Sequence, residues 1–291
     1  MRGYMNGAIP SHKESTVANL ELLKKCFELA KICKAVYAGP IRHSIYSYQG
    51  EAFESQKIIH GSFGRGYCRI FWNKNVVVVA FRGTRESVDW IISNVKAFPV
   101  KLQDCPEKED ILVHNGFQRT LDYGDKTTEI RSLDAIFDCL EEHNLLDREF
   151  VIAGHSLGGA LATLFAVKLR SLKPKVVSNH LSHIITFGAP SVGFQKFKDF
   201  YGELADKTTR VINNADGVPF TPPVFYQHVG NEVWLNKDKL STDVGWPVRL
   251  KYALKGHFTS LATDHSIHNY ILQLSQHVDL KEDETPSKLR L

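Results

Sequence analysis

The stretch FVIAGHSLGGALATLFAVKL, residues 150–169, changes its pattern halfway along. Residues 150–153 are apolar and include two β-branched side chains, which is typical of a buried strand, whereas residues 160–172 are rich in helix-forming alanine and leucine. The hexapeptide GHSLGG, residues 154–159, lies between the two patterns. We therefore expect the chain to turn from a strand directly into a helix at Ser156.

A serine on such a turn has a specific chemical meaning. Gly154 and Gly158 leave room for a strained backbone and for a helix that passes close to the strand. The free N–H groups and the positive end of the following helix favour a negative charge beside the serine. Ser156 is therefore a candidate nucleophile, and the alternative is a glycine-rich turn in which a serine only caps the helix.

The pattern on either side of this turn alternates between strands and helices. A helix over about residues 20–36 ends at Gly39-Pro40, and a hairpin joins residues 69–72 to residues 76–81. Further strands are expected at residues 183–187 and 210–213 and in a strand pair or edge over 225–235, with helices over 116–146, 160–172 and 194–204. This alternation predicts an α/β fold with a mostly parallel central sheet and helices on both faces.

Composition favours one globular domain. The 291 residues are 43% hydrophobic and 23% charged, with neither repeats nor a linker, so we expect a single domain over 1–291 with loose termini at 1–16 and 281–291. The 36 basic and 32 acidic residues leave a net charge of +4 without a basic stripe, which argues against nucleic-acid binding. The apolar runs are too short to cross a bilayer.

A serine hydroxyl needs a histidine base and a carboxylate to orient that base, in the order Ser, Asp or Glu, His along the chain. Asp216 follows the strand expected at residues 210–213 in an Asp-Gly turn, where a strand of a parallel sheet presents its carboxyl end. A turn-forming role without chemistry is the alternative for Asp216. Four other aspartates are expected on the surface, namely Asp199, Asp206, Asp238 and Asp243.

Two histidines compete for the role of base. His265 stands at the start of an apolar-periodic stretch, where a loop residue reaches across to the serine, whereas His268 falls inside the expected helix. We therefore favour His265. Their three-residue spacing suits a metal on a helix, but a third ligand is not evident.

Two backbone N–H groups must hold the oxyanion of the reaction. The first is that of Leu157, the residue after the nucleophile, and the second is that of Thr84, at the end of the strand over residues 76–81. The hydroxyl group of Thr84 offers a further hydrogen bond. The alternative for Thr84 is a turn residue that caps the next helix.

Seven strings together resemble the class 3 lipases, whose best-known members are secreted fungal triacylglycerol lipases with an α/β-hydrolase fold. They are FRGT (81–84), VHNGF (113–117), GHSLGG (154–159), TFGAP (186–190), DGVPFTPP (216–223), HVGNEVWL (228–235) and DHSIHNY (264–270). The resemblance covers about residues 20–274 in the family's order. It implies an α/β-hydrolase fold with Ser156 as nucleophile, Asp216 as orienting acid, His265 as base, and Thr84 with Leu157 as oxyanion hole.

The resemblance further implies a hydrolase of lipid carboxylic esters, either a triacylglycerol or another acylglycerol lipase. A phospholipase A1 or a short-chain esterase needs the same triad, and a non-catalytic lipid-binding or interaction protein on this scaffold is the more distant alternative. The mechanism requires neither a metal nor an organic cofactor. Apolar residues recur at helical spacing over 86–98, where the fungal relatives carry a mobile lid; a fixed helix on the sheet edge is the alternative.

Cellular location and redox state follow from the remaining features. An apolar leader is absent from the N-terminal residues as written, which predicts a cytoplasmic protein, although export by another route stays open. The odd set of cysteines lacks C-x-x-C spacing, so we expect mostly buried, reduced thiols, with one bridged pair as the alternative. The five are Cys26, Cys33, Cys68, Cys105 and Cys139.

Overall fold

The computed structural model describes residues 12–61, 66–84, 98–105, 110–123, 130–222, 225–236, 239–242, 244, 247–248, 251 and 261–284. The helix expected over 86–98 lies outside these ranges, apart from Phe98, as do residues 1–11 and 285–291 of the two ends expected to be loose.

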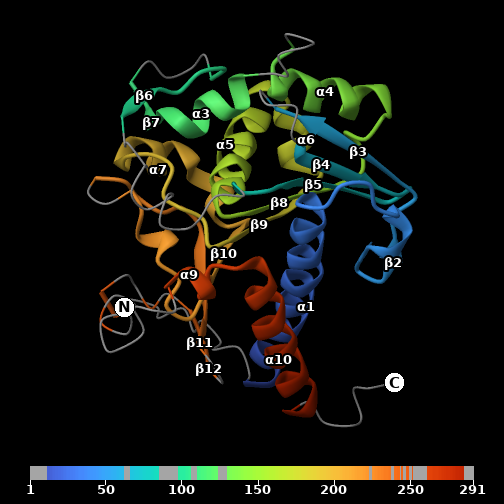
Figure 1. Ribbon diagram of the computed structural model, residues 1–291, viewed down its shortest axis with the longest axis vertical. Coiled ribbons are helices and arrows are strands. Elements are labelled where there is room, and N and C mark those ends of the chain that lie inside the picture. The colour runs from blue at the N-terminus through green and yellow to red at the C-terminus, as the bar shows by residue number, and fades with distance from the viewer. Residues whose placement is uncertain are drawn as a thin grey trace, which may run out of the picture.

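A mixed sheet forms the centre of the fold (Figure 1). Within the described ranges its spatial order is β12 (Lys239–Thr242), β11 (Asn231–Asn236), β10 (Thr208–Asn213), β9 (Leu181–Phe187), β8 (Glu149–His155), β5 (Val76–Phe81), β4 (Gly66–Trp72) and β3 (Ser55–His60). Each pair of neighbours from β5 through β8, β9 and β10 to β11 is parallel. The remaining pairs are antiparallel: β3 with β4 and β4 with β5 at one edge, and β11 with β12 at the other. The predicted mostly parallel α/β sheet is therefore confirmed.

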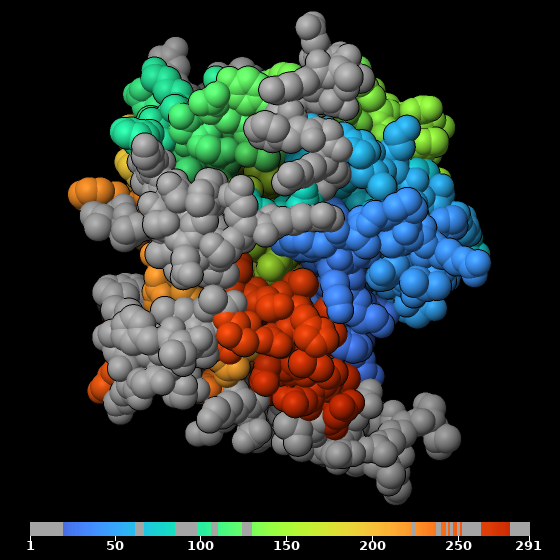
Figure 2. All heavy atoms as spheres, viewed as in Figure 1, coloured from blue at the N-terminus to red at the C-terminus, as the bar shows by residue number. Residues whose placement is uncertain are grey.

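Helices cover both faces of this sheet. The first helix, α1 (His12–Val36), lies side by side with the last, α10 (Ile267–Glu284), on one face. The other face carries α5 (Leu157–Leu172), with α3 (Asn115–Asp122), α4 (Ser132–Glu142) and α6 (Pro174–Asn179) around it. In Figure 2 the atoms of α1 and α10 form one continuous surface. The first and last helices that the structure describes thus lie together on one face.

Smaller elements complete the chain. Two hairpins pair β1 (Ser47–Tyr48) with β2 (Glu51–Ala52) and β6 (Pro99–Lys101) with β7 (Leu112–His114). The short helices α7 (Gln195–Tyr201) and α9 (Leu261–Asp264) precede β10 and α10 respectively. Short 3₁₀ turns lie at His43–Ile45, Gly202–Ala205 and Val218–Phe220.

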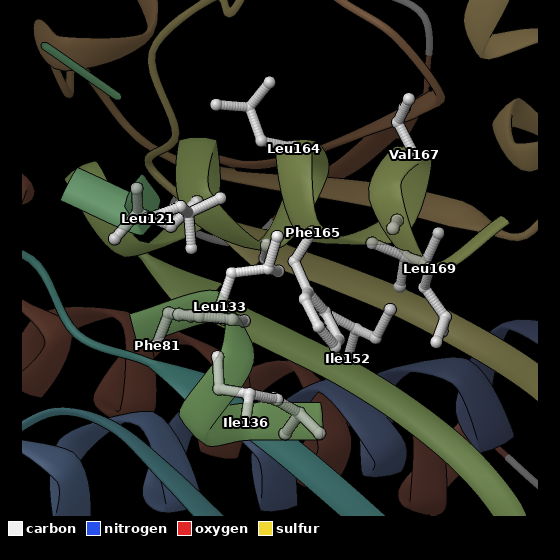
Figure 3. Packing of buried hydrophobic residues seen from close by; sticks show 14 of the residues in the cluster. Phe81, Leu121, Leu133, Ile136, Ile152, Leu164, Phe165, Val167 and Leu169 are labelled. Carbon is white, nitrogen blue, oxygen red and sulfur yellow. The ribbon is translucent and has the colours of Figure 1, made fainter. Parts of the chain in front are cut away.

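Side chains on the central strands alternate between two cores. On β5, Val77, Val79 and Phe81 face α5, whereas Val76, Val78 and Ala80 face α1 and α10. Every residue from Gly158 to Leu169 on α5 is buried, which explains why this helix is apolar on all sides. Figure 3 shows Phe165 and Ile152 among the packed side chains between α5 and the sheet. Each fully buried aliphatic or aromatic side chain stabilises the fold by about 1.5–3 kcal/mol.

Two expectations about local structure are wrong in detail. The helix expected over 116–146 is two helices, α3 and α4, because Tyr123 and Arg131 have extended backbones and the Arg131 guanidinium turns to bind Asp104 and Asp134. The strand expected over 225–235 begins only at Asn231, because Phe225 and Gly230 have φ of 66° and 78°, which a regular strand excludes.

One buried charge stands out in the core around α5. Lys168 has no exposed side-chain surface, and its Nζ lies 2.7 Å from Asp104, 3.5 Å from Asp122 and 3.2 Å from the carbonyl oxygen of Gln103. Arg131 lies 3.1 Å from the same Asp104. This charged cluster fixes the segment that leaves β6 against α5. The five cysteines, in contrast, are all free, buried thiols.

Candidate active site

Ser156 lies on the sharp turn between β8 and α5, where the sequence predicts it. Its backbone has φ 60° and ψ −130°, a strained conformation for a residue with a side chain, at a cost of about 1–3 kcal/mol. Two backbone hydrogen bonds hold the turn: Ser156 N–H donates to the Phe187 carbonyl at 2.9 Å, and Gly159 N–H donates to the Ser156 carbonyl at 2.8 Å. The strain therefore persists because both sides of the turn are fixed.

The glycines of the turn are required by close backbone contacts. A Cβ atom at Gly154 would lie 2.1 Å from the Gly158 carbonyl oxygen, and one at Gly158 would lie 2.4 Å from the Phe81 carbonyl oxygen. Helix α5 thus starts in direct contact with the ends of β8 and β5. This contact places the first N–H groups of α5 beside the end of β5.

Asp216 and His265 come together from two distant loops. Asp216 follows β10, and His265 lies in the turn between α9 and α10. The Nδ1 atom of His265 is 2.9 Å from both carboxylate oxygens of Asp216, and the two residues are only 4% and 1% exposed. A carboxylate in this position holds the imidazole with its proton on Nδ1 and leaves Nε2 as the free acceptor.

Two further donors stabilise the buried carboxylate. The hydroxyl group of Tyr270 donates to Oδ2 of Asp216 at 2.6 Å, and the backbone N–H of Val218 donates to Oδ1 at 2.9 Å. Such charge-assisted hydrogen bonds replace the water that the carboxylate loses on burial. The sequence does not single out Tyr270, because this residue follows the apolar period of α10 and its hydroxyl group carries no separate signal.

The two loops are also joined to each other. Asn213 Nδ2 donates to the Asp264 carbonyl at 2.9 Å, and the Ala215 N–H donates to the Asp264 carboxylate at 3.1 Å. Asp264 immediately precedes His265, so these bonds hold the backbone beside the imidazole against the end of β10. The loop after β10 and the turn before α10 therefore form one unit.

The side-chain ends of Ser156 and His265 are buried. Among the described residues, Ser156 Oγ and His265 Nε2 both lack a hydrogen-bond partner. The backbone of Gly83 packs on the serine, since a Cβ atom there would lie 2.6 Å from Ser156 Cβ and 3.0 Å from Ser156 Oγ. Thr84 follows directly, with a buried Oγ1 that has no hydrogen-bond partner among the described residues, and Leu157 begins α5. Of the five residues that the sequence singles out, Ser156 and Leu157 thus follow β8, Thr84 follows β5, Asp216 follows β10, and His265 is bonded to Asp216.

The competing residues lie elsewhere. His268 is three residues further along α10, exposed, with its Nδ1 3.4 Å from Nζ of Lys34. Asp199 and Asp206 are exposed, and Asp238 and Asp243 lie outside the described residues. In the described ranges, His, Cys, Asp and Glu side chains nowhere gather in a group of three or more that suits a metal ion.

The fold and this arrangement define the class of protein. A strained serine between a strand and a helix, a buried histidine paired with an aspartate that follows a later strand, and a mostly parallel sheet are the features of the α/β-hydrolase fold. The family model described as lipase (class 3) matches residues 78–226. The chain therefore belongs to the class 3 lipase family, as its resemblance to these lipases implied.

Known proteins similar to this chain carry lipase or phospholipase names. It is 30% identical over 180 residues to phospholipase A1-II 2 of Oryza sativa subsp. indica, covering 55% of this chain and 44% of that protein. It is also 30% identical over 169 residues to the secreted mono- and diacylglycerol lipase 1 of Fusarium solani, covering 57% and 46%. This chain thus spans about half the length of these curated relatives.

A solved structure supports the same fold. The crystal structure of a triacylglycerol lipase from Penicillium expansum superimposes with a TM-score of 0.57 and 19% identity, over 78% of this chain and 84% of that one. The α/β-hydrolase fold is therefore confirmed. Among the helices that the structure describes, a segment long and apolar enough to span a membrane does not occur.

Proposed function

We propose that this chain is a serine hydrolase that cleaves the carboxylic ester bonds of lipids through an acyl-enzyme intermediate. The observation that carries the proposal lies at the carboxyl ends of the parallel strands. There the structure has a strained Ser156, whose Oγ lacks a described partner, and a buried His265–Asp216 pair, whose Nε2 lacks one as well. Membership of the class 3 lipase family supports it.

The first half of the reaction forms the acyl-enzyme. Ser156 Oγ attacks the ester carbonyl carbon while His265 Nε2 takes the hydroxyl proton, and the carbonyl oxygen becomes an oxyanion held by the N–H groups of Thr84 and Leu157. When the oxyanion collapses, the bond to the alcohol oxygen breaks, and His265 returns the proton to that oxygen. The products are an ester on Ser156 and a free alcohol.

The second half repeats these steps with water. His265 takes a proton from a water molecule, whose oxygen attacks the acyl carbon, and the proton then passes to Ser156 Oγ as the fatty acid leaves. Asp216 keeps the imidazole in the required tautomer and stabilises the imidazolium. Its three hydrogen bonds, from His265, Tyr270 and Val218, fix the carboxylate itself.

Exposed aromatic side chains on two neighbouring segments support a lipid substrate. Phe98 and Phe225 are 65% and 75% exposed, more than any other phenylalanine that the structure describes. The Phe98 carbonyl accepts a hydrogen bond from the backbone N–H of Asn115. The preceding residue, His114, has its ring centroid 6.0 Å from that of Tyr226, which follows Phe225 in the chain. The two exposed rings therefore project from neighbouring segments, where transient contact with a lipid interface is expected.

The lipid class divides into two candidates. An acylglycerol is favoured by the Fusarium solani relative, which is named a mono- and diacylglycerol lipase. A phospholipid is the second candidate, because a relative of equal identity is named a phospholipase A1. Both need the same triad, so the residues that contact the acyl chain and the rest of the lipid decide between them.

Hydrolysis of defined substrates tests the proposal. Purified chain is assayed on emulsified triacylglycerol and diacylglycerol, on phosphatidylcholine vesicles and on a short-chain ester, with Ser156→Ala alongside. We expect fatty acid release from at least one lipid and none from the variant. A short-chain ester as the sole substrate would make the chain an esterase, and turnover unchanged in Ser156→Ala would reject the mechanism.

A further inference from the structure

A chain of hydrogen bonds runs behind the reacting atoms. The Tyr37 hydroxyl, one residue past the end of α1, accepts the Gly83 N–H at 2.7 Å and lies 2.8 Å from Nδ1 of His155. Nε2 of His155 lies 2.8 Å from the carbonyl oxygen of His265. This Tyr37–His155 chain therefore joins the end of β5, the end of α1, the turn at Ser156 and the backbone of the base.

The direction of each hydrogen bond follows from the number of protons. The His265 carbonyl oxygen can only accept, so Nε2 of His155 carries a proton and donates to it. In a neutral His155 the other ring nitrogen, Nδ1, is then an acceptor, and the Tyr37 hydroxyl, which accepts from Gly83, donates to it. A neutral His155 therefore satisfies both of these hydrogen bonds.

Burial maintains this neutral state. It lowers the pKa of His155 to about 3, an effect to which the nearby His265 adds and which the bond to the His265 carbonyl opposes. Burial also raises the pKa of Tyr37, although its bond from Gly83 acts in the opposite direction. Both groups thus keep the protons that the chain requires over the whole range in which a histidine base works.

The two ends of the chain touch the reaction centre. Tyr37 Oη and Ser156 Cβ both contact Gly83, since a Cβ atom there would lie 2.7 Å and 2.6 Å from them. Gly83 is directly followed by Thr84, whose N–H is the proposed oxyanion donor. At the other end, the ring centroids of His155 and His265 are 4.9 Å apart. A positive charge on His155 at that distance would oppose formation of the His265 imidazolium.

We propose that Tyr37 and His155 are positioning residues for the hydrolysis at Ser156. Tyr37 fixes the Gly83–Thr84 backbone at the distance that the oxyanion needs, and His155 fixes the backbone of His265 without adding a charge beside it. Neither side chain exchanges a proton with the substrate. The inference rests on the proposed function and names residues beyond the triad that set its rate.

The substitution Tyr37→Phe removes the hydroxyl and keeps the ring, including its contact with Arg82. We expect kcat to fall about 10- to 100-fold with KM within about twofold, because the substitution displaces the donor that the transition-state oxyanion needs and leaves ground-state binding of the substrate unchanged. A fluorophosphonate probe, taken to complete labelling, counts the active sites to which kcat is normalised.

A matched control separates positioning from loss of a buried hydrogen bond. Tyr201 on α7 is fully buried, and its hydroxyl is bonded to Thr208 at 2.8 Å, at the opposite end of β10 from Asp216. Tyr201→Phe therefore lowers the melting temperature by a comparable amount but leaves kcat within about twofold. The contrast in kcat between these two variants is the readout that a purely structural role would not produce.

Two replacements of His155 complete the test. His155→Phe breaks both hydrogen bonds and is expected to lower kcat about 10- to 100-fold, whereas His155→Gln keeps one acceptor and one donor and recovers most of that loss. In the double variant with Tyr37→Phe, the losses from the two phenylalanines do not add, because both interrupt one chain.

The outcomes separate the two proposals. A kcat for Tyr37→Phe no lower than that of Tyr201→Phe, or a loss confined to KM, would overturn the positioning role while the wild type still hydrolyses esters. Equal losses in His155→Gln and His155→Phe would overturn the role of the neutral imidazole. A wild type without turnover would instead overturn the proposed function, and this inference with it.

Discussion

Two buried polar networks lie on opposite faces of the central sheet, and one consists of charged groups whereas the other consists of neutral groups. On the α5 face, Lys168 is paired with Asp104 and Asp122, and Arg131 adds a second cation to Asp104. On the α1 face, Tyr37 and His155 form a chain without any formal charge. One network holds a segment with ions, and the other holds the reaction centre with neutral groups.

The difference follows from what each network surrounds. Burial by itself would raise the pKa of Asp104, but the hydrogen bonds and charges of Lys168 and Arg131 outweigh it, and the net pKa is lowered. Such mutual compensation works because these charges are constant. In the proposed mechanism His265, in contrast, gains and loses a proton in every cycle, and a fixed positive charge at His155 would favour one of these two states. The charge that the site does keep, on Asp216, favours the imidazolium.

The largest expected effect comes from removing that charge. Asp216→Asn is expected to lower kcat about 10⁴-fold, because the amide stabilises the wrong tautomer of His265 and leaves the imidazolium without a counter-charge. Steady-state kinetics on the best lipid ester measures the loss. Tyr270→Phe, which removes one of the donors to Asp216 at 2.6 Å, is the graded comparison and should lose far less. Equal kcat in Asp216→Asn and the wild type would contradict the role of the charge.

The charged cluster should instead affect stability. Lys168→Met leaves Asp122 and part of Asp104 without their buried cation, and the free energy of unfolding should fall by about 3 kcal/mol. Lys173→Met, at the end of the same helix, removes an exposed pair with Glu141 and should change it by less than about 1 kcal/mol. Urea denaturation measures both. A Lys168→Met variant as stable as Lys173→Met would show that the cluster contributes no net stability.

A smaller effect is expected on the pH dependence of stability, from the buried neutral histidine His114. Burial lowers the pKa of His114 to about 4, and both of its ring nitrogens lack a hydrogen-bond partner among the described residues. The unfolded chain therefore binds a proton at this residue between about pH 6.5 and pH 4 that the folded chain does not. Stability is complete above this window and falls as the pH falls through it. His114→Phe keeps the stack on Phe117 and should take up about one proton fewer on unfolding near pH 5.

Melting curves between pH 7.5 and pH 4.5 measure this slope. His155, with its pKa lowered to about 3, contributes in the same direction and remains in the variant. A His114→Phe variant with the slope of the wild type would mean that His114 does not stay neutral in the fold.

The smallest effect is expected at His268. It lies on the exposed side of α10 beside Lys34, three residues from His265, so His268→Ala should keep kcat within about twofold. The same assay on His265→Ala should lose several orders of magnitude. A large loss of kcat in His268→Ala would indicate that His268, and not His265, is the base.

Local signals explain what the sequence predicts well. The strand-to-helix turn could be predicted because it requires glycine at positions 154 and 158. At either position a Cβ atom would lie within 2.4 Å of a backbone carbonyl oxygen. Asp216 could be predicted because an Asp-Gly turn follows a strand. In each case the requirement acts between neighbours in the chain.

The remaining parts of the site depend on distant contacts. Tyr37 and His155 are 118 residues apart, and Tyr270 reaches Asp216 across 54 residues. Tyr270 follows the apolar period of its helix, and Lys168 is one polar residue in an apolar run. Only the packing of α1, α5 and α10 on the sheet shows that these polar atoms are buried and paired. The break between α3 and α4 was likewise missed, because Arg131 turns toward Asp104 from another segment.

Labelling by a fluorophosphonate probe tests the central claim most directly. Wild type, Ser156→Ala, His265→Ala and His268→Ala are exposed to the probe in parallel, with and without detergent to vary access to the site. We predict rapid labelling of wild type and His268→Ala, and none of Ser156→Ala or His265→Ala. An unlabelled wild type in the presence of detergent, or undiminished labelling of Ser156→Ala, would contradict it and point to a non-catalytic protein or to another nucleophile.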